Sequence, residues 1–253
     1  MAYRELPPPA PLRGLVECLW SAGVAPGAPP QVQDVLPDGC MDLVWTGTQL
    51  LVAGPDTGPH AVRREPGLAS AGLRFAPGAL PALLGVPAEA LRDQRVPLVE
   101  LQPRLARTAV AHLEHGAPAA RVLDAVALRL PGAPPDPAIA AAAARIGAGA
   151  AVAATADALG WTVRTLHRRC LAGFGYGPAV LRRVLRFRRA AALLHAGVPP
   201  ADAAARAGYA DQPHLSREVR ALAGVTPSQI ARGQLASGAN RSTPLPSGSG
   251  TVA

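Results

Sequence analysis

Residues 157–168 read DALGWTVRTLHR, and residues 206–217 read RAGYADQPHLSR. In both stretches a Gly and an aromatic residue separate a short Ala-rich segment from a segment that carries Leu and Arg. The correspondence continues downstream, where Gly177-Pro178 matches Thr226-Pro227 at a spacing of about 49 residues. A repeat of this kind indicates a duplicated supersecondary unit.

Each copy contains the parts of a helix-turn-helix, in which a tight turn joins a support helix to a recognition helix. In the first unit we predict a support helix over 152–159, a turn at Gly160 and a recognition helix over 163–171. Thr162 is a good N-cap for that recognition helix, because its hydroxyl can accept a hydrogen bond from a backbone N–H of the first turn.

The second unit repeats this order. We predict a support helix over 201–207, a turn at Gly208 and a recognition helix over 212–221 that Asp211 caps. Between the units, residues 178–195 are predicted to form one helix, about 27 Å long at 1.5 Å per residue. Recognition elements lie about 34 Å apart when they enter successive major-groove turns on one face of DNA. The intervening helix is therefore a suitable rigid spacer.

The outward faces of the two recognition helices carry the candidate DNA-binding residues. Leu166 and Leu215 are predicted to point into the core, and helical spacing turns their neighbours outward. Arg pairs with guanine and Gln with adenine through two hydrogen bonds each, so these faces are suited to reading bases. The candidates are Arg164, Thr165, His167 and Arg168 in the first unit, and Gln212, His214, Ser216 and Arg217 in the second.

The predicted spacer helix also carries a cluster of five arginines. They spread around the helix instead of forming one stripe, so we expect some to pair with Asp or Glu and others to contact phosphate. The cluster consists of Arg182, Arg183, Arg186, Arg188 and Arg189.

Charge is distributed unevenly along the chain. Residues 138–253 hold 14 Arg against four acidic residues, whereas residues 1–137 hold 11 Arg against 13 acidic residues. A basic half joined to a nearly neutral half suggests a polyanion-binding domain attached to another module. The alternative is that Arg only solubilises an Ala-rich helical domain.

Residues 138–233 resemble the DNA-binding domain of the AraC-type family of bacterial regulators. The resemblance is carried by the Ala-rich support helices, Leu-x-Arg in each recognition helix, Gly-x-Gly-Pro at 175–178 and the closing run 208–227. The sequence departs from the family pattern at Pro213, where a polar residue is usual, and at Cys170, where an aromatic is common. The resemblance implies two helix-turn-helix units joined by a linker helix, with base or phosphate contacts from Arg164, His167, Arg168, Gln212, His214 and Arg217.

The N-terminal half is predicted to be β-rich with appended helices. Short apolar runs at 32–36, 41–45, 49–53 and 70–75 alternate with Pro and Gly turns, which is typical of a small sandwich or barrel. Asp38 and Asp42 are interpreted as a turn residue and a strand residue, not as a carboxylate site. Helical spacing then predicts helices at 79–84, 88–92, 101–115 and 119–130.

The N-terminal half also resembles a less characterised domain found on some AraC-type regulators. The residues that carry this resemblance are Leu-Pro-Asp-Gly-x-x-Asp-Leu at 36–43 and Gly-Leu-Arg-Phe-x-Pro-Gly at 72–78, and it spans about residues 3–101. It implies a sensor or dimerisation role and names no ligand.

Four segments follow from these patterns. We expect a β-rich sensor-like or dimerisation domain with helices over 1–130, and a Pro-rich linker over 131–137. The DNA-binding domain is expected over 138–233, with Asp136 capping its first helix, and a Ser/Gly/Pro/Thr-rich disordered tail over 234–253.

Several classes of protein and site are disfavoured by the sequence. The three cysteines, Cys18, Cys40 and Cys170, have no CxxC spacing, which argues against a disulfide scaffold or a structural zinc site. The N-terminus lacks the pattern of a signal peptide, and no run approaches the roughly 20 apolar residues of a membrane span. We expect a cytoplasmic protein with no catalytic residue, no metal, no cofactor and no membrane partner.

The fold expected is α+β, with a small barrel-like N-terminal domain and an all-α domain of two helix-turn-helix units joined by a linker helix. The function expected is sequence-specific transcription regulation through double-stranded DNA, with a small-molecule effector, RNA polymerase and a second copy of the chain as further partners. One alternative is a DNA-linked enzyme with a catalytic N-terminal domain, although that class relies on a reactive, metal-held Cys. Another is a non-specific nucleoid-binding protein, which Gln212 and His214 argue against.

Overall fold

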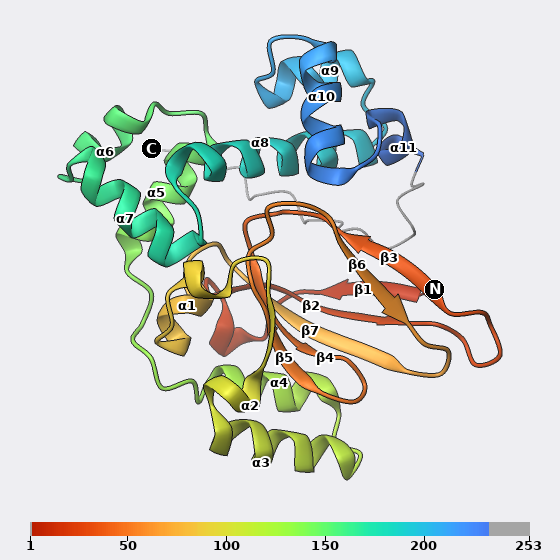
Figure 1. The fold of residues 1–253 in the computed structure, drawn as a ribbon. Helices are drawn as coiled ribbons and strands as arrows, with labels where there is room; N and C mark the ends of the chain where they lie inside the picture. Colours follow the sequence, from red (N-terminus) through yellow and green to blue (C-terminus); the bar gives the residue numbers. More distant parts are fainter. Residues whose placement is uncertain (1, 233–253) are drawn as a thin grey trace, which may run out of the picture.

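Two β-sheets and two groups of helices make up residues 2–232, the part of the chain that the computed structural model describes (Figure 1). The strands are β1 (Ala2–Leu6), β2 (Val16–Gly23), β3 (Gln31–Val35), β4 (Met41–Trp45), β5 (Leu50–Ala53), β6 (His60–Arg64), β7 (Ala69–Phe75) and β8 (Arg95–Pro97). The helices of this half are α1 (Ala79–Leu84), α2 (Leu98–Leu101), α3 (Pro103–Glu114) and α4 (Ala119–Ala127), with 3-10 turns η1 (Ala10–Leu12) and η2 (Ala88–Leu91).

The main sheet has six antiparallel strands in the order β1-β2-β7-β4-β5-β8, and β3 and β6 form a separate two-stranded ribbon. The α+β expectation is confirmed. The strands do not close into a barrel within residues 2–232, because β1 and β8 remain at opposite edges of the sheet.

The turn at residues 37–39 connects the two sheets. Gly39 adopts a positive φ of 83°, and the backbone N–H of Cys40 donates to the Asp38 carboxylate at 2.8 Å. The turn therefore forms as its sequence predicts. It does not close a hairpin, because β3 pairs with β6 and β4 pairs with β5 and β7. It carries the chain from the ribbon into the main sheet.

The core of the N-terminal half lies between the main sheet and helices α2, α3 and α4, which cover one face of it (Figure 1). Alternate residues of β2 are buried, as a half-buried strand requires. Fully buried Leu43, Leu73 and Phe75 of the sheet pack with Leu98 and Leu123 from the helices.

The segment predicted as a linker, 131–137, contacts the N-terminal half at Gly132, whose N–H donates to the carbonyl of Leu83 at 2.8 Å. Leu130, directly before the segment, is buried. The following helix begins as expected, because the Asp136 side chain accepts from the N–H of Ala138. The segment is therefore attached to the N-terminal half at Gly132.

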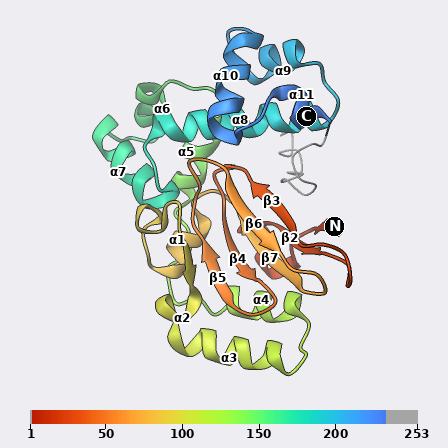
Figure 2. The same ribbon diagram turned by 45° about the vertical axis from the view of Figure 1, so that its right-hand side comes forward.

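The C-terminal half consists of α5 (Pro137–Gly147), α6 (Val152–Ala158), α7 (Val163–Phe174), α8 (Pro178–His195), α9 (Pro200–Ala207), α10 (Gln212–Ala223) and α11 (Pro227–Ala231). Figure 2 shows α8 running across the end of the N-terminal sheets, with α6 and α7 near one of its ends and α9, α10 and α11 near the other. Leu181 and Val184 belong to the core of the first group, and Phe187, Ala190 and Leu194 belong to that of the second.

None of the helices described between residues 2 and 232 has the length and apolar character of a membrane span. The tail predicted at 234–253 lies outside the described residues.

We predict that Gly54→Ala destabilises the chain by about 1–3 kcal/mol, in the range of overpacked sites. A Cβ at this position would lie 1.6 Å from the carbonyl oxygen of Leu91, so the backbone must shift. The measurement is urea denaturation followed by circular dichroism. Gly58→Ala in the same loop meets nothing within 4 Å and serves as the control, with an expected change within about 0.5 kcal/mol. Equal stability of the two variants would contradict the packing described for this loop.

Candidate nucleic-acid interface

The first recognition helix, α7, starts and stops at residues suited to those roles. The Thr162 hydroxyl accepts from the N–H of Thr165 at 3.1 Å, which satisfies one of the free donors of the first turn. Gly175 ends the helix with a φ of 81° in the left-handed region. Leu166 and Cys170 are fully buried in the core of this unit, as their spacing predicts.

The second recognition helix, α10, keeps its first turn despite Pro213. The Asp211 carboxylate accepts from the N–H of His214 at 2.6 Å. Pro213 lies in the first turn, where a backbone N–H has no acceptor within the helix, so nothing is lost there. The helix continues to Ala223 with Leu215, Val219 and Leu222 buried. The departure from the family pattern therefore leaves the helix intact.

The predicted contact residues divide into two groups by exposure. The side chains of Arg164, His167, Arg168, Gln212 and Arg217 belong to exposed residues, whereas Thr165, His214 and Ser216 are half-buried. Within residues 2–232, no ion pair or hydrogen bond ties the side chains of Arg164, Arg168 or Arg217 to another residue. These three guanidinium groups are therefore available to an external partner.

Three of the predicted residues are held by neighbours within the chain. The Thr165 hydroxyl lies 3.0 Å from that of Thr162, and the His214 ring meets the Tyr209 ring edge-on at 5.2 Å between centroids. The His167 ring packs so closely on Gly177 that a Cβ there would lie 2.8 Å from Nε2. Such contacts fix these side chains in place before any partner arrives.

Val163 is an exposed residue that the outward-face analysis did not select. It is the first residue of α7 and is 51% exposed. The signal that marks it is its position directly after the N-cap, because the N-terminal residues of a recognition helix are the ones that contact base edges. Apolar side chains at this end of a recognition helix can contact thymine methyl groups.

Two arginines of α8 bind the first helix-turn-helix unit. Arg182 donates to the carbonyl of Ala150 at 2.9 Å, and Arg189 donates to the carbonyl of Gly147. Gly147 is the last residue of α5, and Ala150 lies in the turn between α5 and α6. These hydrogen bonds hold α8 against the end of α5 and the turn that follows it.

Two further arginines of α8 bind the second unit. Arg183 and Arg186 approach the Glu218 carboxylate on α10 at 2.7 Å and 3.7 Å. The Arg186 guanidinium also stacks over the Tyr209 ring at 4.2 Å. Together with the contacts to the first unit, these interactions define the orientation of both units on α8.

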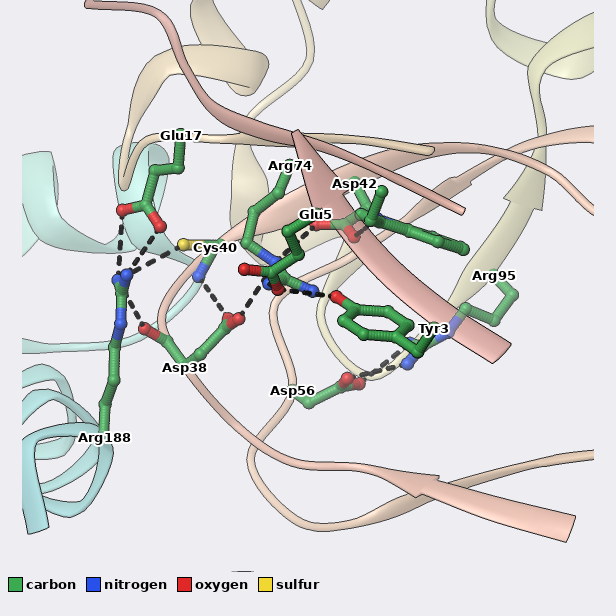
Figure 3. A network of polar contacts seen from close by, with 11 residues as sticks. Tyr3, Glu5, Glu17, Asp38, Cys40, Asp42, Asp56, Arg74, Arg95 and Arg188 are labelled. Atoms are coloured by element: carbon green, nitrogen blue, oxygen red, sulfur yellow. Dashed lines mark hydrogen bonds and ion pairs between the residues drawn. The ribbon is translucent and has the colours of Figure 1, made fainter. Parts of the chain in front are cut away.

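The fifth arginine, Arg188, joins α8 to the N-terminal half. Its guanidinium pairs with both oxygens of Glu17 and lies 3.5 Å from the Cys40 sulfur and from the Asp38 carbonyl (Figure 3). The side chains of Arg188 and Glu17 are only 11% and 21% exposed. The expectation that part of the arginine cluster pairs with acidic residues is thus met, and all five members have partners inside the chain.

A second point of contact joins α7 to the N-terminal half. Arg92 donates to the carbonyl of Gly175 at 3.2 Å, and a Cβ on Gly175 would lie 2.5 Å from Pro55. Leu36 is buried in the core of the second helix-turn-helix unit beside Phe187. Segments 36–40 and 53–56 of the N-terminal half therefore touch the DNA-binding half directly.

These same two segments line a cavity of about 470 Å³ in the N-terminal half. The cavity lies between the β3–β6 ribbon and the main sheet, on the side opposite α3 and α4. Asp38, Asp42 and Arg74 line it together. Asp38 and Asp42 are a turn residue and a strand residue as interpreted from the sequence, and they also form part of a carboxylate cluster that the sequence did not reveal.

The cysteines are buried thiols. Burial raises the pKa of Cys18 and of Cys170 to about 12 in both cases, and it raises the pKa of Cys40 well above its usual range. Among residues 2–232, His, Cys, Asp and Glu side chains do not gather in any group of three that could hold a metal ion.

We predict that Arg188→Ala lowers the free energy of unfolding by about 2–3 kcal/mol, because it leaves the Glu17 carboxylate partly buried without its partner. Urea denaturation measures this. Arg121 on α4 is exposed, and Arg121→Ala is the control with an expected change within about 0.5 kcal/mol. Replacing both partners with Met should restore part of the loss, since no unpaired charge then remains. A loss no larger than that of the control would contradict the role of this ion pair.

Comparisons with known proteins agree with this architecture. Residues 155–233 match a family model described as a helix-turn-helix domain, and residues 4–97 match a domain of unknown function, DUF6597. A comparison with curated protein sequences gives no match at a significant level.

Solved structures of ToxT from Vibrio cholerae are similar to the chain. An apo variant from strain SCE256 has 10% identity and a TM-score of 0.46, covering 85% of this chain and 100% of that one. ToxT from strain O395 has 9% identity and a TM-score of 0.47, covering 85% and 95%. The same protein bound to (E)-4-(8-methylnaphthalen-1-yl)but-3-enoic acid has 10% identity and a TM-score of 0.46, covering 85% and 97%.

The chain therefore carries a helix-turn-helix domain of the AraC type at residues 155–233, the kind of domain that transcription regulators use to bind DNA, and a DUF6597 domain at residues 4–97.

Proposed function

We propose that this chain regulates transcription by inserting α7 and α10 into the major groove of one specific double-stranded DNA site. One observation carries the proposal. Arg168 and Arg217 occupy equivalent places in the two units, each two residues beyond a fully buried Leu, and both are exposed without an internal partner in the described chain. The arginines of α8, in contrast, are all engaged inside the chain.

The contact residues are assigned by exposure. We assign base or phosphate contacts to Arg164, His167 and Arg168 of α7 and to Gln212 and Arg217 of α10, because their side chains are exposed. The half-buried Thr165, His214 and Ser216 lie on the same faces and are assigned contacts at the rim of each face. Val163 is added as an apolar contact.

The domain boundaries belong to the same proposal. We place the effector-responsive module in residues 1–130 and the DNA-binding domain in 138–233, joined by 131–137. Helices α5 to α11 form the second of these, with its own two apolar cores. Leu36 of the N-terminal half is buried in the second of these cores.

A small-molecule effector is the second proposed partner. The support is the 470 Å³ cavity, whose size suits a small ligand. Its lining segments 36–40 and 53–56 touch α8 and the end of α7. A ligand that favours one arrangement of those segments would shift the arrangement of the recognition helices, which is what coupling between two sites requires.

Further partners follow from the function and the fold. The edge strand β1 offers backbone groups to a second copy of the chain, and the exposed Leu6 at its end adds apolar surface, which supports a homodimer. RNA polymerase is proposed on the function alone, without a particular contact residue. A regulator of this kind works in the compartment that holds the DNA, so we propose a cytoplasmic location.

We predict that Arg168→Ala and Arg217→Ala each cost about 1–3 kcal/mol at the cognate site, as the loss of a bidentate guanine contact does. The loss should be confined to a few base positions, with non-specific DNA bound nearly as before. Site selection from random duplex DNA, with the wild type and each variant, identifies the site and the affected positions. Fluorescence anisotropy over a range of salt concentrations then gives the affinities.

Arg145→Ala is the matched control, because Arg145 is an exposed arginine on α5 and belongs to neither recognition helix. It should retain both the affinity and the sequence preference of the wild type. A phosphate contact would give a different pattern, in which all sequences lose affinity alike and the salt slope falls by about one unit. If both recognition-helix variants keep wild-type affinity and preference, the proposed DNA-reading face is wrong.

A further inference from the structure

The core of the second helix-turn-helix unit includes a side chain from the N-terminal half of the chain. Leu36 directly follows β3 and is only 5% exposed. It is buried in a cluster whose other buried members come from residues 187–230, on α8 to α11 and the segment that contains Tyr209. Leu36 is therefore a long-range member of a core that otherwise belongs to the DNA-binding half.

The second unit has little apolar bulk of its own with which to fill this core. Of the fourteen buried residues that form it in the described part of the chain, six are Ala. Ala side chains let helices approach closely, but each one fills little space. The few large side chains therefore decide whether the core reaches the packing density of a protein interior.

The recognition helix α10 depends on the same core. Its buried residues Leu215, Val219 and Leu222 belong to the cluster that contains Leu36. Removal of a buried Leu leaves a void, and the surrounding structure moves into that void only in part. Loss of the Leu36 side chain would therefore leave α10 on a loosened support.

The backbone of Leu36 is fixed from the N-terminal side. Pro37 restricts the residue before it to extended conformations. The turn that follows contacts α8, because the Asp38 carbonyl lies 3.5 Å from the Arg188 guanidinium (Figure 3) and a Cβ on Gly39 would lie 3.2 Å from Leu185. Leu36 thus enters the core from a turn that is itself attached to α8.

The core of the first helix-turn-helix unit has a different origin. Its buried residues in the described chain lie between Ala142 and Val184. The end of α7 contacts the N-terminal half elsewhere, through the Gly175 carbonyl and Arg92. A change at Leu36 therefore acts directly on the core that holds α10 and not on the core that holds α7.

We propose that Leu36 is a positioning residue for the second recognition helix: by completing the core beneath α10, it holds that helix in the orientation in which it meets DNA. The inference rests on the proposed function, in which α10 reads bases, and adds a residue of the N-terminal half that acts through α10. Only molecules with α10 in the competent orientation bind the full site, so the apparent affinity falls with their fraction.

The first test is hydrogen exchange of backbone amides in the full chain without DNA. Leu36→Ala should raise the exchange rates of α10 about tenfold or more, because local opening of this unit becomes easier, and should leave those of α7 within about twofold. Leu36→Met conserves the side-chain volume and should restore exchange close to that of the wild type. Leu36→Val should be intermediate, and it serves as the test if Leu36→Ala does not fold.

Leu50→Ala is the matched control, because Leu50 is also a buried leucine of the N-terminal half, 3% exposed, but packs in the core of the main sheet. It should lower the urea midpoint of the chain as Leu36→Ala does. It should not accelerate exchange in α10 relative to α7.

The second test is DNA binding by the same variants. Leu36→Ala should weaken binding to the cognate site about tenfold, as expected if one molecule in about ten keeps α10 in the competent orientation. The loss of sequence preference should be confined to the base positions that Arg217→Ala affects. The positions that Arg168→Ala affects should keep the wild-type preference, and Leu36→Met should bind like the wild type.

Three results would overturn the proposal: wild-type exchange in α10 of Leu36→Ala, equal acceleration in α7 and α10, or a loss of preference at all base positions alike. The last two would leave Leu36 with a general role in stability only. Faster exchange in α10 without an effect at any base position would have a different meaning. It would keep the contact that holds α10 and refute the reading of bases by α10 in the proposed function.

Discussion

The arrangement of the DNA-binding half depends on hydrogen bonds and ion pairs that radiate from one helix. Four arginines of α8 contact the end of α5 and the turn after it, Glu218 on α10 and the Tyr209 ring. They hold both helix-turn-helix units on this one helix. The apolar residues of the first half of α8 enter the core of the first unit, and those of its second half enter the core of the second unit. Because two recognition helices must meet DNA at a defined separation, the stiffness of this connection matters more than the strength of any single contact.

Arg188 joins α8 to the N-terminal half in a similar way, but its surroundings differ from those of the other four arginines. Its partner Glu17 lies 171 positions away in the sequence, and both side chains are mostly removed from solvent. A buried ion pair contributes little net stability relative to an apolar pair, but it is costly to break on one side only. This ion pair therefore joins β2 to α8 specifically, because both charged groups lose their partners if it breaks.

The parts of the structure that follow from short-range sequence signals could be predicted. The spacer helix at 178–195 has the predicted bounds, because Pro178 begins it and apolar residues recur at helical spacing. The caps Thr162, Asp211 and Asp136 were predictable for the same reason, since a cap needs only its own side chain and the following turn. The recognition helices extend two or three residues beyond the predicted ends, up to the left-handed Gly175 and Gly224.

What was missed depends on contacts between distant residues. The strands β1, β2, β6 and β8 were not predicted, and the turn at 37–39 did not reveal that its flanking strands belong to different sheets. Strand pairing is decided by side-chain packing across the sheet, which no local pattern encodes. The Arg74 cluster joins residues from three strands and a turn, so it was equally hidden. Likewise, no pattern within α8 distinguishes an arginine that binds phosphate from one that binds a carbonyl in its own chain.

The Arg74 cluster lies beside the cavity and is also connected to α8. Asp38 contributes its carboxylate to the Arg74 cluster in the cavity and its backbone carbonyl to Arg188 on α8. A single turn of chain therefore carries both the contact with the cavity and the contact with the linker helix. Gly39 of the same turn adopts a positive φ and lies against Leu185 of α8, which adds a second contact between this turn and α8. In the proposed effector role, a ligand that displaces Asp38 would also displace the carbonyl that Arg188 of α8 contacts.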